Sequence, residues 1–161
     1  MALHLAPIPV HQIAMVVRDL EACMEEYHRT LGWGPWNVYE YRPPRFHQAI
    51  WHGRPAGFTY LGAEAKVDTV WIELLQPLDG PSLFTDWLDR RGEGLHHLGY
   101  GATSRDGADA IRRSYEQAGT SVLFEGWIDQ VYFYYLDTKP TIIEVWVGDP
   151  ESVTASRTYP A

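Results

Sequence analysis

The chain presents the same order of features twice, and this repetition constrains its fold more than any other feature. Residues 12–20 (QIAMVVRDL) open the first half, and residues 97–105 (HLGYGATSR) open the second. Each stretch reads as a short apolar strand that runs into a capped helix. Each half later ends on a strand with one acidic residue among apolar ones, in residues 71–75 (WIELL) and 142–146 (IIEVW). Two copies of one unit, each with two potential metal ligands, indicate a site built between the copies.

The first half is predicted to have the order β-α-β-β-β. Residues 10–17 are apolar and partly β-branched and predict a strand, and Asp19 is a suitable N-cap for the helix that follows. Apolar residues recur at helical spacing up to Leu31, and Gly32 occupies the position of a left-handed C-terminal cap. The stretch 45–57 fits no element clearly. The other strands are expected through about Tyr41, near 57–62 and over 67–76, with a turn at 63–66.

The second half repeats this order after a connecting helix with Ser82 as its N-cap. It comprises a strand over 95–102, a helix that ends at Gly119, and strands near 120–125, 130–137 and 141–147. The fold class is therefore α+β, with two tandem βαβββ modules. The expected divisions are 8–77 for the first module, 78–94 for the helical connection, 95–148 for the second module and 149–161 for a polar tail, extended or loosely packed.

Composition narrows the classes of protein to consider. The 161 residues fit one compact domain or two small modules that share a sheet, and 45% are hydrophobic. A formal charge of −8 argues against nucleic acid and against anionic membranes as partners. The single cysteine, Cys23, excludes an internal disulfide and a cysteine-rich zinc site, and we expect it to be a packed thiol. Neither a signal peptide nor a membrane span is recognisable, so a cytoplasmic protein is expected.

Strand alternation predicts which side chains share a face. In the first strand Ile13, Met15 and Val17 are bulky enough to meet the helix, which places Gln12 on the opposite face. In the strand that opens the second half, the same reasoning groups His97 with two glycines, which leave room for a ligand. Gln12 and His97 are thus expected to point into one cavity. The preceding histidines, His11 and His96, are expected to point towards the helices.

Glu73 and Glu144 are carboxylates in otherwise apolar strands. A buried carboxylate without a partner is costly, so each needs a partner or a metal ion, unless it lies at a sheet end and reaches water. Together with Gln12 and His97, the set offers three oxygen-type ligands and one imidazole nitrogen. This mixture suits one divalent ion of zinc, nickel, cobalt, manganese or iron.

These motifs resemble the vicinal oxygen chelate superfamily, which includes glyoxalase I, methylmalonyl-CoA epimerase, extradiol dioxygenases and the fosfomycin and bleomycin resistance proteins. The resemblance spans roughly 10–148 and is greatest to the glyoxalase-like, epimerase-like branch. It rests on five segments: QIAMVVRDLE from Gln12, LGWGPW from Leu31, IELLQP from Ile72, GLHHLGY from Gly94 and IEV from Ile143. It implies a glyoxalase-like fold with a cupped mixed sheet.

The resemblance also implies a ligand set and a chemistry. Counting back from Asp19 as in that family gives Gln12, and His11 is the fallback if the strand slips by one residue. The implied ligands are then Gln12, Glu73, His97 and Glu144, a set similar to that of glyoxalase I. The implied activity is a metal-dependent isomerase, epimerase or lyase that acts next to a carbonyl through a metal-stabilised enolate. Glu144 is the first choice of base and Glu73 the second, although metal binding lowers a carboxylate's basicity.

The remaining candidates concern the substrate pocket. An apolar or aromatic substrate is expected, because several aromatic residues and two histidines are candidates for the pocket lining. These are Trp36, His47, Trp51, His52, Trp71, Phe133, Tyr135 and Trp146. For the aromatic residues the alternative is core packing, and for the histidines it is a surface position. Glu40 is a further candidate base, with a solvent-facing position as its alternative.

Two other functions stay open. A drug- or metabolite-binding protein of the resistance type needs no metal ligands, so the retained ligand set favours an enzyme. A metal-dependent oxygenase needs iron and a second imidazole, which only His11 or a loop histidine supplies. A small molecule is the expected substrate, but Arg42, Arg45 and Arg54 are a thin set for the phosphates of coenzyme A. A homodimer is expected, since paired units of this kind pack within one chain or between two chains.

Overall fold

A computed structural model describes residues 7–161 of the protein. Its centre is one mixed sheet whose eleven strands follow the order β11-β2-β5-β6-β1-β7-β10-β9-β8-β3-β4. The first half of the chain contributes β1 (Gln12–Val16), α1 (Leu20–Leu31), β2 (Trp36–Tyr41), β3 (Phe46–Trp51), β4 (Arg54–Pro55), β5 (Tyr60–Val67) and β6 (Val70–Pro77). The rest contributes α2 (Leu83–Arg91), β7 (Gly94–Ala102), α3 (Arg105–Gln117), β8 (Val122–Ile128), β9 (Val131–Leu136), β10 (Ile142–Val147), η1 (Pro150–Ser152) and β11 (Arg157–Tyr159).

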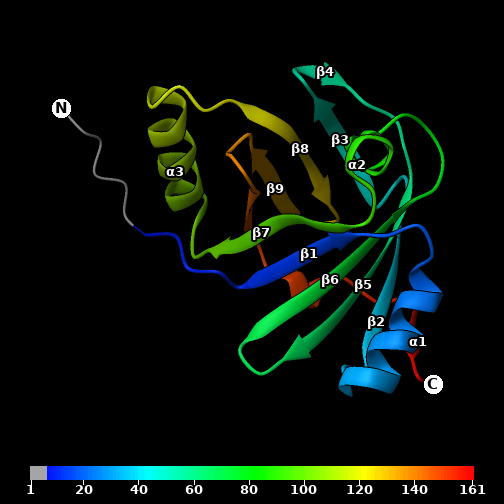
Figure 1. Ribbon diagram of the computed structural model, residues 1–161. Coiled ribbons are helices and arrows are strands. Elements are labelled where there is room, and N and C mark those ends of the chain that lie inside the picture. Colours follow the sequence, from blue (N-terminus) through cyan, green and yellow to red (C-terminus); the bar gives the residue numbers. More distant parts are fainter. Residues whose placement is uncertain (1–6) are drawn as a thin grey trace.

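Two βαβββ units make up most of this sheet and meet at its middle. Within the units, β1 pairs parallel with β6, and β7 pairs parallel with β10. The two opening strands, β1 and β7, pair antiparallel with each other and join the units. In Figure 1, α1 and α3 flank the sheet on opposite sides of this seam, and α2 covers one end of the cup. The fold is the expected α+β arrangement of two tandem units around a cupped mixed sheet.

Local signals in the sequence account for the helix ends. The Asp19 side chain accepts a hydrogen bond from the Ala22 N–H, and Gly32 adopts a φ of 70° as a left-handed cap, so both predictions are confirmed. Ser82 also acts as the predicted N-cap, for α2. None of the helices in residues 7–161 is long and apolar enough to span a membrane.

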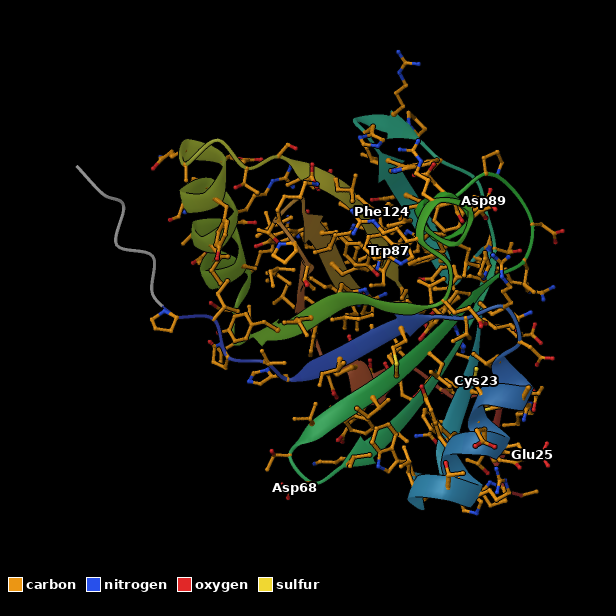
Figure 2. The ribbon with its side chains drawn as sticks, viewed as in Figure 1. Cys23, Glu25, Asp68, Trp87, Asp89 and Phe124 are labelled. Carbon is orange, nitrogen blue, oxygen red and sulfur yellow. The ribbon has the colours of Figure 1, made fainter. Side chains whose placement is uncertain are left out.

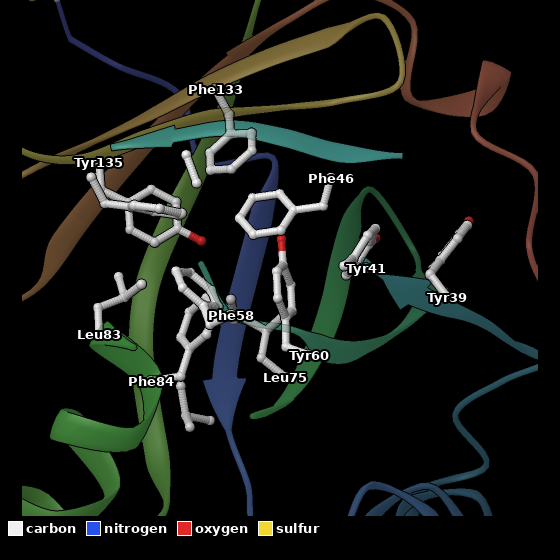
Figure 3. Close-up of a cluster of buried hydrophobic side chains, with 14 of the residues drawn as sticks. Tyr39, Tyr41, Phe46, Phe58, Tyr60, Leu75, Leu83, Phe84, Phe133 and Tyr135 are labelled. Carbon is white, nitrogen blue, oxygen red and sulfur yellow. The ribbon is translucent and has the colours of Figure 1, made fainter. Parts of the chain in front are cut away.

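Three hydrophobic clusters hold the layers together. The largest lies on the inner side of the cup, where aromatic rings from β2, β3, β5, β8 and β9 pack with the apolar face of α2 (Figure 3). A second lies between α1 and the first unit, and Cys23 packs against it, as predicted for a packed thiol (Figure 2). A third lies between α3 and the second unit. Helices therefore bury the outer faces of both units, and the inner face is left for aromatic residues and a cavity.

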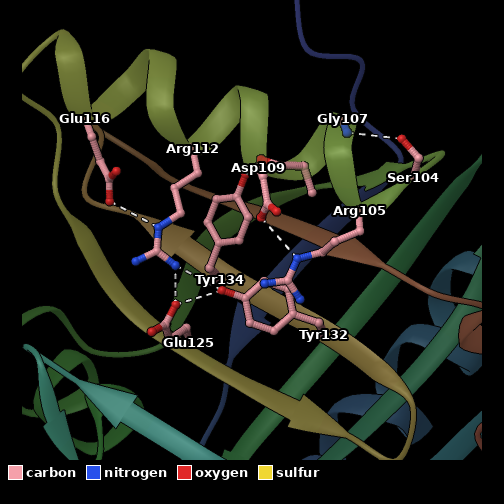
Figure 4. A network of polar contacts seen from close by, with 10 residues as sticks. Ser104, Arg105, Gly107, Asp109, Arg112, Glu116, Glu125, Tyr132 and Tyr134 are labelled. Atoms are coloured by element: carbon pink, nitrogen blue, oxygen red, sulfur yellow. Dashed lines mark hydrogen bonds and ion pairs between the residues drawn. The ribbon is translucent and has the colours of Figure 1, made fainter.

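A polar network also fixes α3 to the second unit. The Arg112 guanidinium donates hydrogen bonds to the carboxylate of Glu125 on β8 and to the hydroxyl of Tyr132 on β9, and that hydroxyl donates to Glu125 at 2.7 Å (Figure 4). The Arg105 guanidinium lies 4.0 Å from the Tyr132 ring centre, a cation–π contact. Arg105 and Arg112 of α3 therefore lie on the outer side of the sheet and not on its inner side.

The stretch 45–57, which the sequence left unassigned, forms the β3–β4 hairpin. Although it lies in the first half of the chain, β3 pairs antiparallel with β8 of the second unit. Phe46 from β3 packs in the inner cluster against Phe58 and Phe124. The hairpin thus extends the second unit's edge, a long-range pairing that no local pattern reveals.

The turn predicted at 63–66 is wrong, because β5 continues through these residues to Val67. The chain turns at Asp68 instead, at the tip of the β5–β6 hairpin (Figure 2). Two residues of the predicted turn, Ala63 and Ala65, are instead fully buried where the strand packs under α1. Their small size serves close packing, and Glu64 between them faces the inner side of the sheet.

The tail at 149–161 is more ordered than predicted. After the turn η1, Val153 is buried in the inner cluster, and the Ser156 N–H donates to the Val38 carbonyl at 2.8 Å. β11 then pairs antiparallel with β2, at the far edge of the first unit. The end of the chain therefore runs from the second unit across to the first.

Candidate functional site

Four adjacent strands, β6, β1, β7 and β10, bring the predicted ligands together. Sheet register aligns Glu73 with Ala14 and Ala14 with His97, which forms one row across the sheet. The next row contains Gln12, Gly99 and Glu144, in the same way. In each row a small residue, Ala14 or Gly99, therefore stands between two polar side chains. The antiparallel pairing of β1 with β7 relates the two rows by symmetry.

Glu73, His97 and Glu144 converge closely enough to hold a metal ion. One ligand atom from each lies within 4.8 Å of the others. The Nε2 atom of His97 is 3.4 Å from a Glu73 oxygen and 3.1 Å from a Glu144 oxygen, and His97 is fully buried. Such a cluster of two carboxylates and one imidazole suits a divalent ion.

Two unpartnered atoms support this interpretation. Gln12 Oε1 and His97 Nε2 are buried and have no hydrogen-bond partner of suitable geometry within residues 7–161. Buried polar atoms are rarely left without a partner, and a bound cation would satisfy both lone pairs. The Gln12 amide nitrogen donates to Glu64 at 3.2 Å, which leaves Oε1 as the free end of the amide. The donor set thus fits a divalent ion held by Gln12, Glu73, His97 and Glu144.

Gly99 and Gly101 were expected to leave room for a ligand, but protein side chains occupy that room. A Cβ atom on Gly99 would lie 2.8 Å from Gln12 Oε1 and 2.8 Å from the Trp146 ring, and one on Gly101 would lie 2.9 Å from the same ring. Real Cβ contacts are longer than this. Because these glycines lack side chains, the side chains of Gln12 and Trp146 can lie against the inner side of β7.

The alternation predicted for His96 and His97 fails at a β-bulge. The register between β1 and β7 shifts beside Ala14, so both histidines are buried, and His96 packs under α2 with its ring 4.7 Å from that of Trp87. His96 does face a helix, but it lies on the inner side, and its Nδ1 is 2.9 Å from the Nδ1 of His97. One of the two nitrogens must carry the proton, so this contact constrains the tautomer of His97.

Glu64 on β5 is a site residue that the sequence did not reveal. It lines the cavity directly opposite Glu73 in the β5–β6 register, and it does not belong to the ligand cluster. Burial, with the nearby charges of Glu73 and Glu144, raises the pKa of Glu64 from 4.5 to about 8. The turn predicted at 63–66 concealed it, whereas an unbroken strand would have placed it on the face opposite the two buried alanines.

Charge and burial compete at the ligand cluster. Burial opposes the charged form of His97, but the charge of Glu144 and then that of Glu73 outweigh it and raise the pKa of His97 to about 9. Burial raises the pKa of Glu73, although His97 acts in the opposite direction. Burial and the charge of His97 hold the pKa of His96 well below its usual value, so His96 is the neutral partner of the pair.

A cavity of about 310 Å³ opens above this cluster. Three of the predicted pocket residues, Trp71, Phe133 and Trp146, line it. The other lining residues are Gln12, Asn37, Tyr39, Tyr41, Glu64, Glu73, Ile128, Val131, Glu144, Pro150, Glu151, Val153 and Ala155. The tail at 149–161 thus supplies part of the wall, which the sequence did not indicate.

The other predicted pocket residues lie elsewhere. Trp36 is fully buried in the cluster beneath α1, on the outer side of the sheet. Tyr135 is buried beside the His97 ring, 4.7 Å away, and does not line the cavity. Trp51 packs at the edge of the inner cluster. His47 contacts the Asp129 carbonyl, and His52 is exposed in the β3–β4 turn, where its φ is 50°.

Two alternative site residues also lie outside the cluster. His11 Nδ1 accepts a hydrogen bond from the Gly101 N–H at 3.2 Å, and the ligand cluster found in residues 7–161 does not include it. That cluster holds one imidazole, His97, rather than the two that the oxygenase alternative requires. Glu40 is exposed and forms an ion pair with Arg42 at 2.8 Å, as its solvent-facing alternative predicts.

Comparison with solved structures shows that the fold is shared. A methylmalonyl-CoA epimerase from Mycobacterium tuberculosis is 20% identical, with a TM-score of 0.63 over 94% of this chain and 98% of that chain. A single-residue variant of the Streptomyces coelicolor methylmalonyl-CoA epimerase, in complex with 2-nitronate-propionyl-CoA, is 21% identical, with a TM-score of 0.64 over 94% and 100%. A hypothetical protein from Bacillus halodurans C-125 is 18% identical, with a TM-score of 0.64 over 89% and 96%.

Comparison with curated proteins gives no match. The family described as the Glyoxalase/Bleomycin resistance protein/Dioxygenase superfamily matches residues 11–135, which include both opening strands and most of the second unit. The paired βαβββ units agree with that match. The chain therefore belongs to the glyoxalase/bleomycin resistance protein/dioxygenase superfamily.

Proposed function

We propose that the protein is a metal-dependent isomerase or epimerase that moves a proton at a carbon next to a carbonyl; a lyase that begins with the same proton removal uses the same groups. The observation that carries the proposal is the convergence of Glu73, His97 and Glu144 below a cavity, with Gln12 beside them and a further carboxylate, Glu64, outside the cluster. The likeness to methylmalonyl-CoA epimerases of the same fold supports this class of reaction.

Gln12, Glu73, His97 and Glu144 would hold the divalent ion. When bound, the ion would supply Lewis-acid stabilisation of the negative charge that develops on a carbonyl oxygen as the neighbouring carbon loses its proton. The Gln12 amide is oriented for this role, because its nitrogen donates to Glu64 and its buried oxygen has no hydrogen-bond partner within residues 7–161. His96 constrains the orientation of the His97 ring, because the Nδ1 atoms of the two residues are in contact.

Glu64 is better suited than the ligand carboxylates to carry the proton. Glu144 and Glu73 were the first choices as bases, but a carboxylate that binds a cation becomes less basic. Glu64 lies outside the ligand cluster, so its carboxylate stays free to accept and return a proton, and its burial raises its pKa towards neutral pH. We therefore propose Glu64 as the proton carrier, with Glu144 as the alternative.

The cavity walls shape the rest of the reaction. Trp71, Phe133 and Trp146 present apolar surface to a substrate and keep water away from the carbon that loses its proton. Water exclusion matters because it strengthens the electrostatic stabilisation of the negative charge that develops as the proton leaves.

Two measurements test the proposal together. Protein purified without added ions is expected to contain close to one divalent ion per chain by elemental analysis. In deuterated water, NMR is then expected to show exchange at the carbon next to the carbonyl in some members of a panel of neutral aromatic ketones and aldehydes. Chelation should abolish the exchange, and readdition of the ion should restore it.

Two results would contradict the proposal. Tight ligand binding with neither metal nor exchange would instead identify a binding protein of the resistance type. Metal content that stays constant when His97 is replaced by alanine would show that the ion binds elsewhere.

A further inference from the structure

The cavity that lies above the ligand cluster is acidic and aromatic. Four carboxylates line it, from Glu64, Glu73, Glu144 and Glu151, and the lining residues within 7–161 include neither lysine nor arginine. Two of these carboxylates belong to the cluster, and their charges would balance that of a divalent ion. The remaining two face the substrate space without a basic residue beside them in the lining.

Among the residues that line this cavity, an anionic substrate would meet no lysine or arginine; the Lys66 ammonium lies outside the lining, 5.7 Å from the centre of the Trp71 ring. Burying a charge without a partner of opposite sign is costly, and like charges placed together repel. Coenzyme A thioesters carry several phosphate charges, and a cavity of about 310 Å³ is too small to enclose the whole ester. The charge of the cavity lining therefore acts against this class of substrate.

The Trp71 wall already attracts a cation. Lys66 stands directly opposite Trp71 in the β5–β6 register, and its ammonium lies 5.7 Å from the centre of the indole ring. This is the distance of a cation–π contact, and Lys66 itself is exposed and does not line the cavity. Trp71 thus makes a cation–π contact within the protein, and Trp146 adds a second indole to the wall of the cavity.

The fourth carboxylate comes from the tail. Glu151 lies in the turn η1, and its own N–H donates to the Asp149 side chain. Its side chain is exposed, lines the cavity and forms no ion pair with the residues described, 7–161. Val153 and Ala155 continue the same wall as apolar surface. The tail therefore adds both a negative charge and part of the apolar boundary.

We propose that this cavity selects uncharged or cationic aromatic carbonyl compounds and excludes anionic ones, including coenzyme A thioesters. This inference rests on the proposed function, because it takes the same cavity as the substrate site. It departs from the coenzyme A ester bound by the structural neighbour from Streptomyces coelicolor.

Three probes of similar shape test the charge preference. These are 4-nitroacetophenone, which is neutral, 4-acetylbenzoate, which is anionic and isosteric with it, and 4-acetyl-N,N,N-trimethylanilinium, which is cationic. Isothermal titration calorimetry on the protein as purified, with its metal, is expected to show that the neutral and cationic probes bind at least about tenfold more tightly than the anion. Acetyl-CoA is expected to bind no better than 4-acetylbenzoate.

A matched pair of variants locates the source of the preference. Glu151→Gln removes one charge from the cavity wall and should weaken binding of the cationic probe about twofold to fivefold relative to the neutral one. Glu25→Gln removes the same charge from the exposed face of α1, outside the cavity, and should leave that ratio unchanged. Glu25 is labelled in Figure 2.

The inference is overturned if 4-acetylbenzoate or acetyl-CoA binds as tightly as 4-nitroacetophenone, or if none of the aromatic probes binds. Because calorimetry measures binding alone, failure of the proposed function stays separate from this result. Charge selection without deuterium exchange would refute only the isomerase. Exchange on anionic substrates would refute only the charge selection.

Discussion

The Gln12 side chain has space on the inner side of the sheet because Gly99 stands opposite it on the neighbouring strand. A side chain there would come within 2.8 Å of the Gln12 amide oxygen. Ala14 plays the same part between Glu73 and His97. Small residues between strands thus decide whether the polar groups converge, and the contacts of Glu64 and His96 decide how those groups are oriented.

Replacing Glu64 by glutamine separates proton transfer from metal binding. The new side chain keeps an oxygen that can accept the Gln12 hydrogen bond but cannot exchange a proton. We expect the exchange rate to fall about 100-fold or more, with the metal dissociation constant unchanged within about twofold. NMR exchange and calorimetric metal titration measure the two quantities. An exchange rate equal to that of the unmodified protein would assign the role of proton carrier to Glu144 instead.

Replacing His96 by alanine tests whether His96 fixes the tautomer of His97. The variant should bind a divalent ion about 10- to 100-fold more weakly, because His97 loses the neighbour that fixes its tautomer. His96→Asn, whose amide oxygen can accept from His97 Nδ1, should recover part of the affinity. Competition with a chelator measures the affinity, and circular dichroism checks the fold. Equal losses in the two variants would indicate a packing role only.

At the scale of elements, close approach between strands shapes the cavity. β2 and β5 are adjacent, and although their register pairs Gly62 with Tyr39, the ring of Tyr41, a cavity-lining residue, lies against Gly62. The β3–β4 hairpin and β11 lengthen the sheet at its two edges. The cavity itself is lined by strands of both units and by residues between 150 and 155, so residues far apart in the chain meet in its wall.

Gly62→Ala tests this close approach. The added Cβ would lie 2.5 Å from the Tyr41 ring, and both sites are buried, so the variant should lose about 1 to 3 kcal/mol of unfolding free energy. Gly57→Ala is the matched control, since nothing lies within 4 Å of its Cβ. Urea unfolding measures both variants. Similar stabilities for the two would show that Tyr41 moves aside without cost.

At the scale of the whole molecule, the cluster links stability to pH and to metal. Glu64 and His97 both have pKa values raised in the folded state, to about 8 and about 9. A raised pKa means that the folded protein binds more protons than the unfolded chain. This contribution to stability is complete below the unfolded pKa values and is lost as pH rises through the folded ones.

The metal-free protein should therefore become less stable between about pH 5 and pH 9, the window that these two groups define. Melting temperatures measured with a chelator present will check this trend. Glu64→Gln should flatten the part of the slope below pH 8, and Glu25→Gln should not. Added divalent ion should raise the melting temperature most at the alkaline end, where the ligands are deprotonated. A melting temperature that rises with pH under chelation would contradict the assigned pKa shifts.

The sequence by itself determined those features that depend on local periodicity and on the duplication. Asp19 and Gly32 mark the ends of α1 through their own backbone preferences, and alternation places Gln12 and Glu73 on the inner face. The repeat then supplied the corresponding positions in the second unit. These patterns predicted the fold class, and they named Glu73, His97 and Glu144, the three side chains that the structure brings together.

The remaining features of the site depend on pairings between distant segments, so only the tertiary structure decided them. Glu64 joins the cavity only because β5 runs unbroken beneath α1, and His96 turns inward only because of a bulge against β1. The hairpin that begins at Phe46 pairs with a strand of the other unit, and Glu151 lies in the wall of the cavity. Periodicity reports which face a residue occupies within its own strand, whereas register and packing between strands determine what that face meets.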